Sequence, residues 1–218
     1  MSELRILIAD DHELVRRGVR TLLEAEPGWK VVAEASDGQE AFEKAEETKP
    51  EIVVLDIGMP RLSGLETARR LKRTFPQIKV LMLTVHDSEH LAVEVLNAGA
   101  RGYVTKSDTA RDLVIAIEAL RKDKTFFTSS VDRIILNNFL DGRPYERSKE
   151  MQVELLTSRQ REIVQLLAEG KTSKDVSALL NLSVKTVETH RANIMKRLSC
   201  HSVSELVRYA VRNNIVQP

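Results

Sequence analysis

The sequence predicts an α/β fold followed by a smaller all-helical domain. Over residues 3–122, short apolar runs alternate five times with helical patterns, and from Leu155 onward only helical patterns occur. Between the two parts, residues 141–150 (DGRPYERSKE) carry Gly, Pro and charges without an apolar period, which is typical of a linker. Regular alternation of strand and helix predicts a doubly wound five-stranded parallel sheet with helices on both faces.

Each element follows from a local pattern. The predicted strands are the apolar runs at residues 4–10, 29–36, 51–56, 79–84 and 102–106. The predicted helices show a 3.6-residue apolar period at residues 13–26, 38–47, 64–75, 89–99 and 110–122. A further stretch, residues 129–140 (SSVDRIILNNFL), predicts one isolated amphipathic helix. We expect it to belong to the connection between the two domains.

Composition limits the classes of protein to which the chain can belong. The 42% hydrophobic and 30% charged residues are ordinary for a soluble globular protein. No apolar run approaches the roughly 18 residues of a membrane span, and the first run ends in two acids, unlike a signal peptide. We therefore expect a cytoplasmic protein with no membrane partner. The single Cys200 has no partner for a disulfide or a zinc site.

Charge is distributed unevenly along the chain. Residues 1–124 contain 19 Lys and Arg against 22 Asp and Glu, a net −3. Residues 151–218 contain 10 Lys and Arg against 6 Asp and Glu, a net +4. A basic C-terminal part is typical of a nucleic-acid-binding domain.

Reactive side chains stand at the ends of the predicted strands. In a doubly wound sheet with strand order 2-1-3-4-5, ligands bind at the carboxyl ends of the strands, where the winding reverses. The chain places there three carboxylates, a hydroxyl and an ammonium: Asp10, Asp11, Asp56, Thr84 and Lys106. Converging carboxylates repel one another unless a cation compensates, and Mg²⁺ suits hard oxygen ligands beside a phosphate. The set contains the parts needed to transfer a phosphoryl group to a carboxylate.

These residues resemble the receiver domain of bacterial two-component response regulators. The resemblance covers residues 3 to about 122 and depends on DD after the first strand, DIGMP after the third, a Thr ending the fourth and YVTK around the fifth. It implies that Asp56 is the phosphoacceptor, with Thr84 and Lys106 contacting the phosphoryl group. It also implies Mg²⁺ ligands from Asp10, Asp11, Asp56 and the Gly58 carbonyl. Tyr103 matches the aromatic switch residue, acting with Thr84.

One departure from the receiver pattern follows Thr84. Receivers usually carry a small residue at this position, whereas this chain carries Val85. The branched side chain of Val85 is expected to narrow access to the phosphoryl site. Whether small phosphodonors suffice is left open by the sequence, and we expect a kinase to be the better donor.

The C-terminal quarter predicts a helix-turn-helix. Thr157 is a plausible helix N-cap, the first helix ends near Gly170, the next begins at Thr172, and NLS marks another turn. On the helix over residues 184–198, apolar side chains fall on one face and small or basic side chains on the other. From periodicity alone, this second face could equally be a solvated helix surface.

LTSRQREIVQLLAEG followed by SVKTVETHRANIMKRL closely resembles the four-helix LuxR-type DNA-binding domain, over residues 152–217. The resemblance implies that the last helix, SVSELVRYAVRNN, packs in the core and often forms a dimer contact. We expect the DNA-binding residues to be Lys185, Thr186, Glu188, Thr189, Arg191, Ala192, Lys196 and Arg197. Of these, Arg191, Lys196 and Arg197 are expected to contact phosphates, and His190 is left unassigned.

A receiver at 3–122, a linker with one helix at 123–151 and a LuxR-type domain at 152–217 together match the NarL/FixJ group of response regulators. The match implies a phosphorylation-dependent transcription regulator that receives its phosphoryl group from a sensor histidine kinase. It also implies binding to a double-stranded DNA operator, and a homodimer when phosphorylated or DNA-bound. Two alternatives stay open. The receiver could switch by protein contact without phosphorylation, which the intact acid set disfavours. An independent enzyme is disfavoured by the lack of a glycine-rich nucleotide loop, nucleophile–base pair or His cluster.

Overall fold

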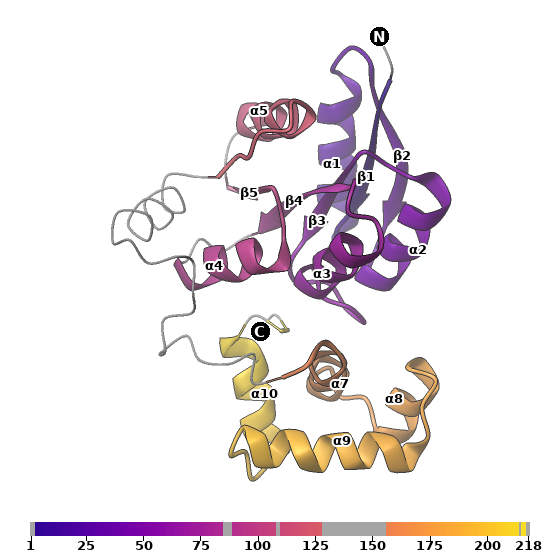
Figure 1. Cartoon of the computed structure of the whole chain (residues 1–218), viewed down its shortest axis with the longest axis vertical. Coiled ribbons are helices and arrows are strands. Elements are labelled where there is room, and N and C mark those ends of the chain that lie inside the picture. The colour runs from indigo at the N-terminus through magenta and orange to yellow at the C-terminus, as the bar shows by residue number, and fades with distance from the viewer. Residues whose placement is uncertain (1–2, 85–88, 108–109, 128–155, 214, 217–218) are drawn as a thin grey trace.

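A computed structural model of the chain describes residues 3–84, 89–107, 110–127, 156–213 and 215–216. The N-terminal part contains one parallel sheet with the strand order β2-β1-β3-β4-β5, as the sequence predicts. Figure 1 shows the helices packed on both faces of this sheet and the later helices as a separate unit. The strands are Leu4–Ala9 (β1), Trp29–Ala35 (β2), Ile52–Asp56 (β3), Lys79–Thr84 (β4) and Gly102–Thr105 (β5).

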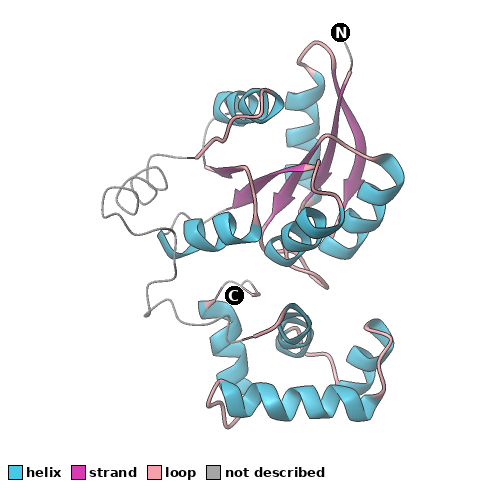
Figure 2. Cartoon of the chain, viewed as in Figure 1, coloured by secondary structure: helices cyan, strands magenta, loops and turns pink. Residues whose placement is uncertain are grey.

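Helices follow the strands in strict alternation and then continue alone. Those of the N-terminal part are Glu13–Glu24 (α1), Gly38–Thr48 (α2), Gly64–Thr74 (α3), Glu89–Ala98 (α4) and Ala110–Arg121 (α5). Those of the C-terminal unit are Ser158–Ala168 (α7), Ser173–Leu179 (α8), Val184–Arg197 (α9) and Val203–Arg212 (α10). Among the described residues, Figure 2 shows strands in the N-terminal part alone. The helix predicted at residues 129–140 and the linker at 141–150 lie outside the described residues.

Alternate side chains of the sheet enter two separate apolar cores. Val53 and Leu55 of β3 pack on the face covered by α2, α3 and α4. Ile52 and Val54 pack on the opposite face, covered by α1 and α5. A strand buried on both faces reads as a continuous apolar run, which explains the sequence IVVL. The only charged residue of β3 is Asp56, at the end that reaches the rim of the sheet.

The connection from β3 to α3 folds tightly back on the sheet. The Gly64 N–H donates to the Ile57 carbonyl at 2.9 Å, and a Cβ on Gly64 would lie 1.9 Å from the Asp56 carbonyl oxygen. On the other side, the Gly38 N–H donates to the Leu62 carbonyl at 3.1 Å. Glycine at these two positions allows backbones to approach closely. The chain after Asp56 is therefore fixed against the start of α2.

The C-terminal unit has its own core and well-formed helix starts. Thr157 and Gln160 form a capping box at α7, and Thr172 and Asp175 form another at α8. Side chains from all four helices, together with Leu156, form a third apolar cluster that excludes the sheet. The N-cap predicted at Thr157 and the helix start at Thr172 are confirmed. Within the described residues, no helix is both long and apolar enough to span a membrane.

Candidate functional site

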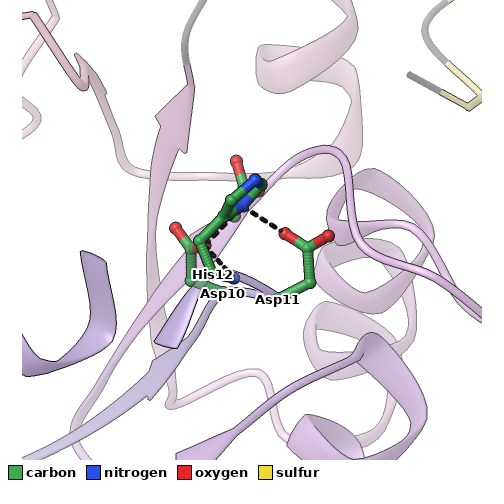
Figure 3. A group of neighbouring side chains, drawn as sticks. Asp10, Asp11 and His12 are labelled. Carbon is green, nitrogen blue, oxygen red and sulfur yellow. Dashed lines mark hydrogen bonds and ion pairs between the residues drawn. The ribbon is translucent and has the colours of Figure 1, made fainter. Parts of the chain in front are cut away.

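The carboxylates predicted at the strand ends converge in the structure. Asp10 directly follows β1, and Asp56 is the last residue of β3. Ligand atoms of Asp10, Asp11, His12 and Asp56 all lie within 4.8 Å of one another. Asp10 is 1% and Asp56 0% exposed, whereas Asp11 stands at the exposed edge. Figure 3 shows Asp10, Asp11 and His12 gathered in the turn that leads into α1.

Lys106 supplies the countercharge of this cluster. Its Nζ lies 2.7 Å from Asp10 Oδ2 and 3.1 Å from Asp56 Oδ2. The Lys106 N–H donates to the Thr84 carbonyl, which fixes the residue after β5 to the end of β4. One ammonium thus bridges two buried carboxylates. The positions of Asp10, Asp56 and Lys106 agree with the arrangement that the strand order predicts.

Burial makes the charged form of Asp56 unfavourable. Desolvation first, and the nearby Asp10 carboxylate second, raise the pKa of Asp56 from 3.8 to about 6, against the opposing effect of Lys106. For Lys106, burial acts to lower the pKa, but the hydrogen bonds and charges of Asp10 and Asp56 outweigh it and raise the pKa. The site therefore favours additional positive charge beside its carboxylates.

The donor set fits a hard divalent cation. Asp10 Oδ2 and Asp56 Oδ2 are buried and have no hydrogen bond of standard geometry among the described residues, apart from their ion pairs with Lys106. Their other oxygens accept backbone N–H groups, from His12 to Asp10 Oδ1 and from Ile57 to Asp56 Oδ1, each at 2.8 Å. Two fixed carboxylates, each presenting a second oxygen, are typical of Mg²⁺ binding.

The remaining predicted receiver residues belong to β4, β5 and the segment that follows β3. Thr84 ends β4 and is 4% exposed, and half-buried Gly58 lies two residues after Asp56. Tyr103 is 0% exposed and packs in the core formed by α2, α3 and α4. Its ring is therefore wholly inside the receiver in this structure. Val85, expected to narrow the site, lies outside the described residues.

The residues predicted to bind DNA lie on α9. Val187 and Ile194 are 0% exposed, and both pack in the core of the C-terminal unit. Of the eight predicted residues, Thr186 and Arg191 are half-buried, and six are exposed: Lys185, Glu188, Thr189, Ala192, Lys196 and Arg197. The predicted division of α9 into an apolar and an open face is confirmed. His190, which the sequence leaves unassigned, is half-buried.

Two hydroxyl groups on this helix have local partners. The Thr186 hydroxyl lies 2.8 Å from Ser183 Oγ, the N-cap side chain of α9. The Thr189 hydroxyl donates to the Lys185 carbonyl at 2.9 Å. Both side chains are therefore partly committed to the helix itself, which leaves Lys185, Glu188 and Ala192 as the open groups at its N-terminal end.

Two residues near the acids were absent from the sequence-based set. His12 Nδ1 lies 2.7 Å from Asp11 Oδ1 and 3.3 Å from Asp10 Oδ1. Its position next to Asp10 and Asp11 in the sequence was an available signal. Arg16 donates to the Asp10 carbonyl oxygen at 2.7 Å from one turn into α1. Only the path of the turn reveals this second contact.

Comparison with known families assigns both parts of the chain. Residues 6–118 match the family model described as response regulator receiver domain. Residues 154–210 match the model described as bacterial regulatory proteins, luxR family. The oxygen regulatory protein NreC of Staphylococcus haemolyticus is 35% identical over 215 residues, which cover 98% of this chain and 99% of the relative.

Solved structures with both domains are also similar. RcsB from Salmonella enterica serovar Typhimurium, bound to promoter rprA with the phosphomimetic BeF3-, is 26% identical with a TM-score of 0.61. That match covers 95% of this chain and 98% of RcsB. A structure of two RcsB dimers bound to two parallel DNAs matches with 26% identity and a TM-score of 0.58, covering 97% of this chain and 99% of the other.

Proposed function

Because the chain belongs to the two-component response regulators that join a receiver domain to a LuxR-type DNA-binding domain, its function is phosphorylation-dependent regulation of transcription, and we propose which residues perform it. The receiver comprises residues 3–122, the linker 123–151 and the DNA-binding domain 152–217. Asp56 is the phosphoacceptor. The observation that carries this assignment is the buried carboxylate at the end of β3, bridged to Asp10 by Lys106.

Phosphoryl transfer to Asp56 uses the arrangement of the strand ends. A carboxylate oxygen of Asp56 attacks the phosphorus atom, and the bond between phosphorus and the histidine nitrogen of the sensor kinase breaks. The Lys106 ammonium and the Thr84 hydroxyl stabilise the negative charge on the phosphoryl oxygens. Because Asp56 is buried between other charges, it is held in one position before the donor arrives.

The groups that would hold Mg²⁺ at this rim are the carboxylates of Asp10, Asp11 and Asp56 and the Gly58 carbonyl. The metal, when bound, neutralises charge on the carboxylates and on the incoming phosphoryl group. The raised pKa of Asp56 supports this role, since a second cation offsets the desolvation and repulsion that raise it. The exposed position of Asp11 leaves one side of the site open to solvent.

The exposed face of α9 enters the major groove of an operator. Lys185, Thr186, Glu188, Thr189 and Ala192 face the bases, and Arg191, Lys196 and Arg197 contact phosphates. The separation of α9 into a buried and an open face supports this role. A homodimer forms on phosphorylation or on DNA, as the dimers of the similar RcsB structure support.

Phosphorylation acts as a shift between two states. The phosphoryl group on Asp56 draws Thr84 and Lys106 toward itself, and Tyr103 adjusts with Thr84. The state that results favours DNA binding. The phosphoryl donor is a sensor histidine kinase.

Labelling with a phosphorylated sensor kinase tests the acceptor. Incubation in Mg²⁺ should label the wild-type protein and leave Asp56→Asn unlabelled, and an excess of chelator should slow the wild-type reaction strongly. The matched control is Glu51→Gln, which changes an exposed carboxylate just before β3. Label that persists in Asp56→Asn would show that another residue accepts the phosphoryl group.

A further inference from the structure

The loop that follows Asp56 contacts the DNA-binding domain directly. The side-chain amide of Gln165, on α7, accepts from the Ser63 N–H at 2.9 Å and donates to the Met59 carbonyl at 2.8 Å. Glu169, the C-cap residue of α7, accepts from the Arg61 N–H at 3.2 Å. Three backbone groups of residues 59–63 are thus bonded to one helix of the other domain. We call this set of contacts the loop clasp.

The loop clasp is specific because its donors and acceptors are fixed on both sides. Gln165 is 2% exposed, and its amide also donates to Glu169 at 2.9 Å. On the receiver side, Arg61 donates to Asp37 Oδ2 at 2.8 Å, so the same loop is held to the start of α2. The β3–α3 connection is therefore bonded from two directions.

Ion pairs flank the loop clasp. Glu162, one turn before Gln165, pairs with Arg70 of α3, and Arg161 lies 3.4 Å from Glu94 Oε2 of α4. No apolar cluster of the described residues spans the two domains, because each of the three clusters lies within one of them. An interface of hydrogen bonds and ion pairs without an apolar core is typical of domains that separate reversibly.

The loop clasp leaves the predicted DNA-binding face open. Figure 1 shows α7 toward the receiver and α9 on the side facing away from the sheet. Lys185, Glu188 and Lys196 are exposed in this arrangement. The contact between the domains therefore does not act by covering these residues. Instead, the contact holds the loop that begins at Asp56, the proposed phosphoacceptor.

We propose that Gln165 is a positioning residue for the phosphoacceptor loop, and that the loop clasp restrains phosphorylation of Asp56 until the two domains separate. The proposal rests on the proposed function of Asp56. Residues 59–63 are bonded at three backbone groups, so the backbone next to Asp56 has little freedom to adjust when a phosphoryl group enters.

Charge gives the direction of the coupling. The loop already faces the Glu169 carboxylate, which accepts from the Arg61 N–H, and a phosphoryl group on Asp56 adds further negative charge at the start of the same loop. Added negative charge weakens the loop clasp. Since coupling free energies between sites are reciprocal, the loop clasp also disfavours phosphorylation.

The test compares initial rates of Asp56 labelling in the full-length protein, with a radiolabelled, phosphorylated sensor kinase as the donor in the presence of Mg²⁺. Gln165→Met removes both hydrogen bonds to the loop and keeps a side chain of similar length. It should be labelled faster than wild type by about threefold or more, as the loss of one or two hydrogen bonds predicts. Arg70→Met, which breaks a flanking ion pair without changing the loop, should raise the rate by a smaller factor.

Gln160→Met is the matched control. Gln160 has the same amide on the same helix, but its Oε1 accepts from the Thr157 N–H within the DNA-binding domain. Its labelling rate should equal that of wild type. The thermal unfolding transition of the receiver should be the same in Gln165→Met as in wild type. A faster labelling rate then results from lost positioning of the loop and not from loss of structure.

Several outcomes would overturn the inference. These are a Gln165→Met rate equal to or below that of wild type, or an equal acceleration in Gln160→Met. If Asp56→Asn stays unlabelled by the kinase while Gln165→Met is not accelerated, only the loop clasp is refuted. If Asp56→Asn is labelled, the proposed acceptor is wrong as well.

Discussion

The acid cluster and the open face of α9 place their charges in opposite environments. Asp10 and Asp56 are almost completely buried, and the pKa of Asp56 is raised to about 6, chiefly by desolvation. Lys185, Glu188 and Lys196 on α9 are exposed to solvent. A buried charge changes the folding free energy, whereas an exposed charge changes it little. The proposed phosphorylation site is therefore coupled to stability, whereas the proposed DNA-binding face is nearly independent of it.

A substitution on the buried face of α9 should lower stability much more than one on its exposed face. Ile194 is 0% exposed in the core of the C-terminal unit, so Ile194→Ala should destabilise that unit by about 2–4 kcal/mol through lost contacts and a cavity. Because the cores of the two domains are separate, the receiver's transition should not move. Urea unfolding followed by circular dichroism, beside Ala192→Ser on the open face, would check this. Equal destabilisation by both substitutions would contradict the assigned orientation of α9.

A substitution in the acid cluster, Asp56→Asn, should change the free energy of unfolding less than Ile194→Ala does, and in the opposite direction. The pKa of Asp56 in the folded protein is about 6, above its ordinary 3.8. Protonated Asp56 therefore contributes to the free energy of unfolding at low pH, and this contribution is lost as the pH rises through about 6. In chelator at pH 8, Asp56→Asn should therefore stabilise the receiver by about 1–3 kcal/mol. The gain should fade toward pH 4, as measured by urea unfolding.

Saturating Mg²⁺ provides the control for that prediction. It should stabilise the wild-type receiver more than Asp56→Asn, because the variant lacks one anionic ligand. If Asp56→Asn instead destabilises the receiver at pH 8 in chelator, the attraction of Lys106 to the Asp56 carboxylate outweighs the cost of its desolvation and its repulsion from Asp10.

On the open face of α9, substitution of Glu188 should change which DNA sequences the protein prefers without changing its stability. A carboxylate can accept a hydrogen bond from cytosine N4, so Glu188→Ala should change the preferred base at one position by about 1–3 kcal/mol. Selection of sites from random DNA would show it, with the unfolding midpoint unchanged. An unaltered selected motif would mean that α9 is rotated from the proposed position.

Lys196 should give the smallest effect. It is exposed in the last turn of α9 and is expected to meet a phosphate. Lys196→Ala should weaken binding to all sequences alike and lower the slope of log affinity against log salt by about one unit. Fluorescence anisotropy over a salt series measures this slope. A changed sequence preference with an unchanged slope would reverse the roles of Lys196 and Glu188.

Local patterns were sufficient to predict the fold and the acid cluster. Parallel strands bring their carboxyl ends to one edge, so the positions of Asp10, Asp56 and Lys106 followed once the strands were found. The division of α9 followed from its period, which put Val187 and Ile194 inside. In both cases, neighbours along a strand or a helix turn determine the position.

Contacts between distant segments were not predictable in this way. Gln165 reads as an ordinary polar residue in α7, yet it bonds a loop about 100 residues earlier in the chain. The same holds for Arg16, whose contact with the Asp10 carbonyl depends on the path of the turn before α1. No local period encodes which surface of one domain meets the other, so only the folded chain reveals the loop clasp.

We propose that phosphorylation of Asp56 controls DNA binding through the exposed face of α9. The most direct measurement is the affinity for a selected operator duplex before and after phosphorylation by a sensor kinase, in wild type and in Asp56→Asn. We expect an increase in affinity of about fivefold or more for wild type, the lower range of typical coupling between sites, and no increase for Asp56→Asn. Equal affinities for phosphorylated and unphosphorylated wild-type protein would contradict it.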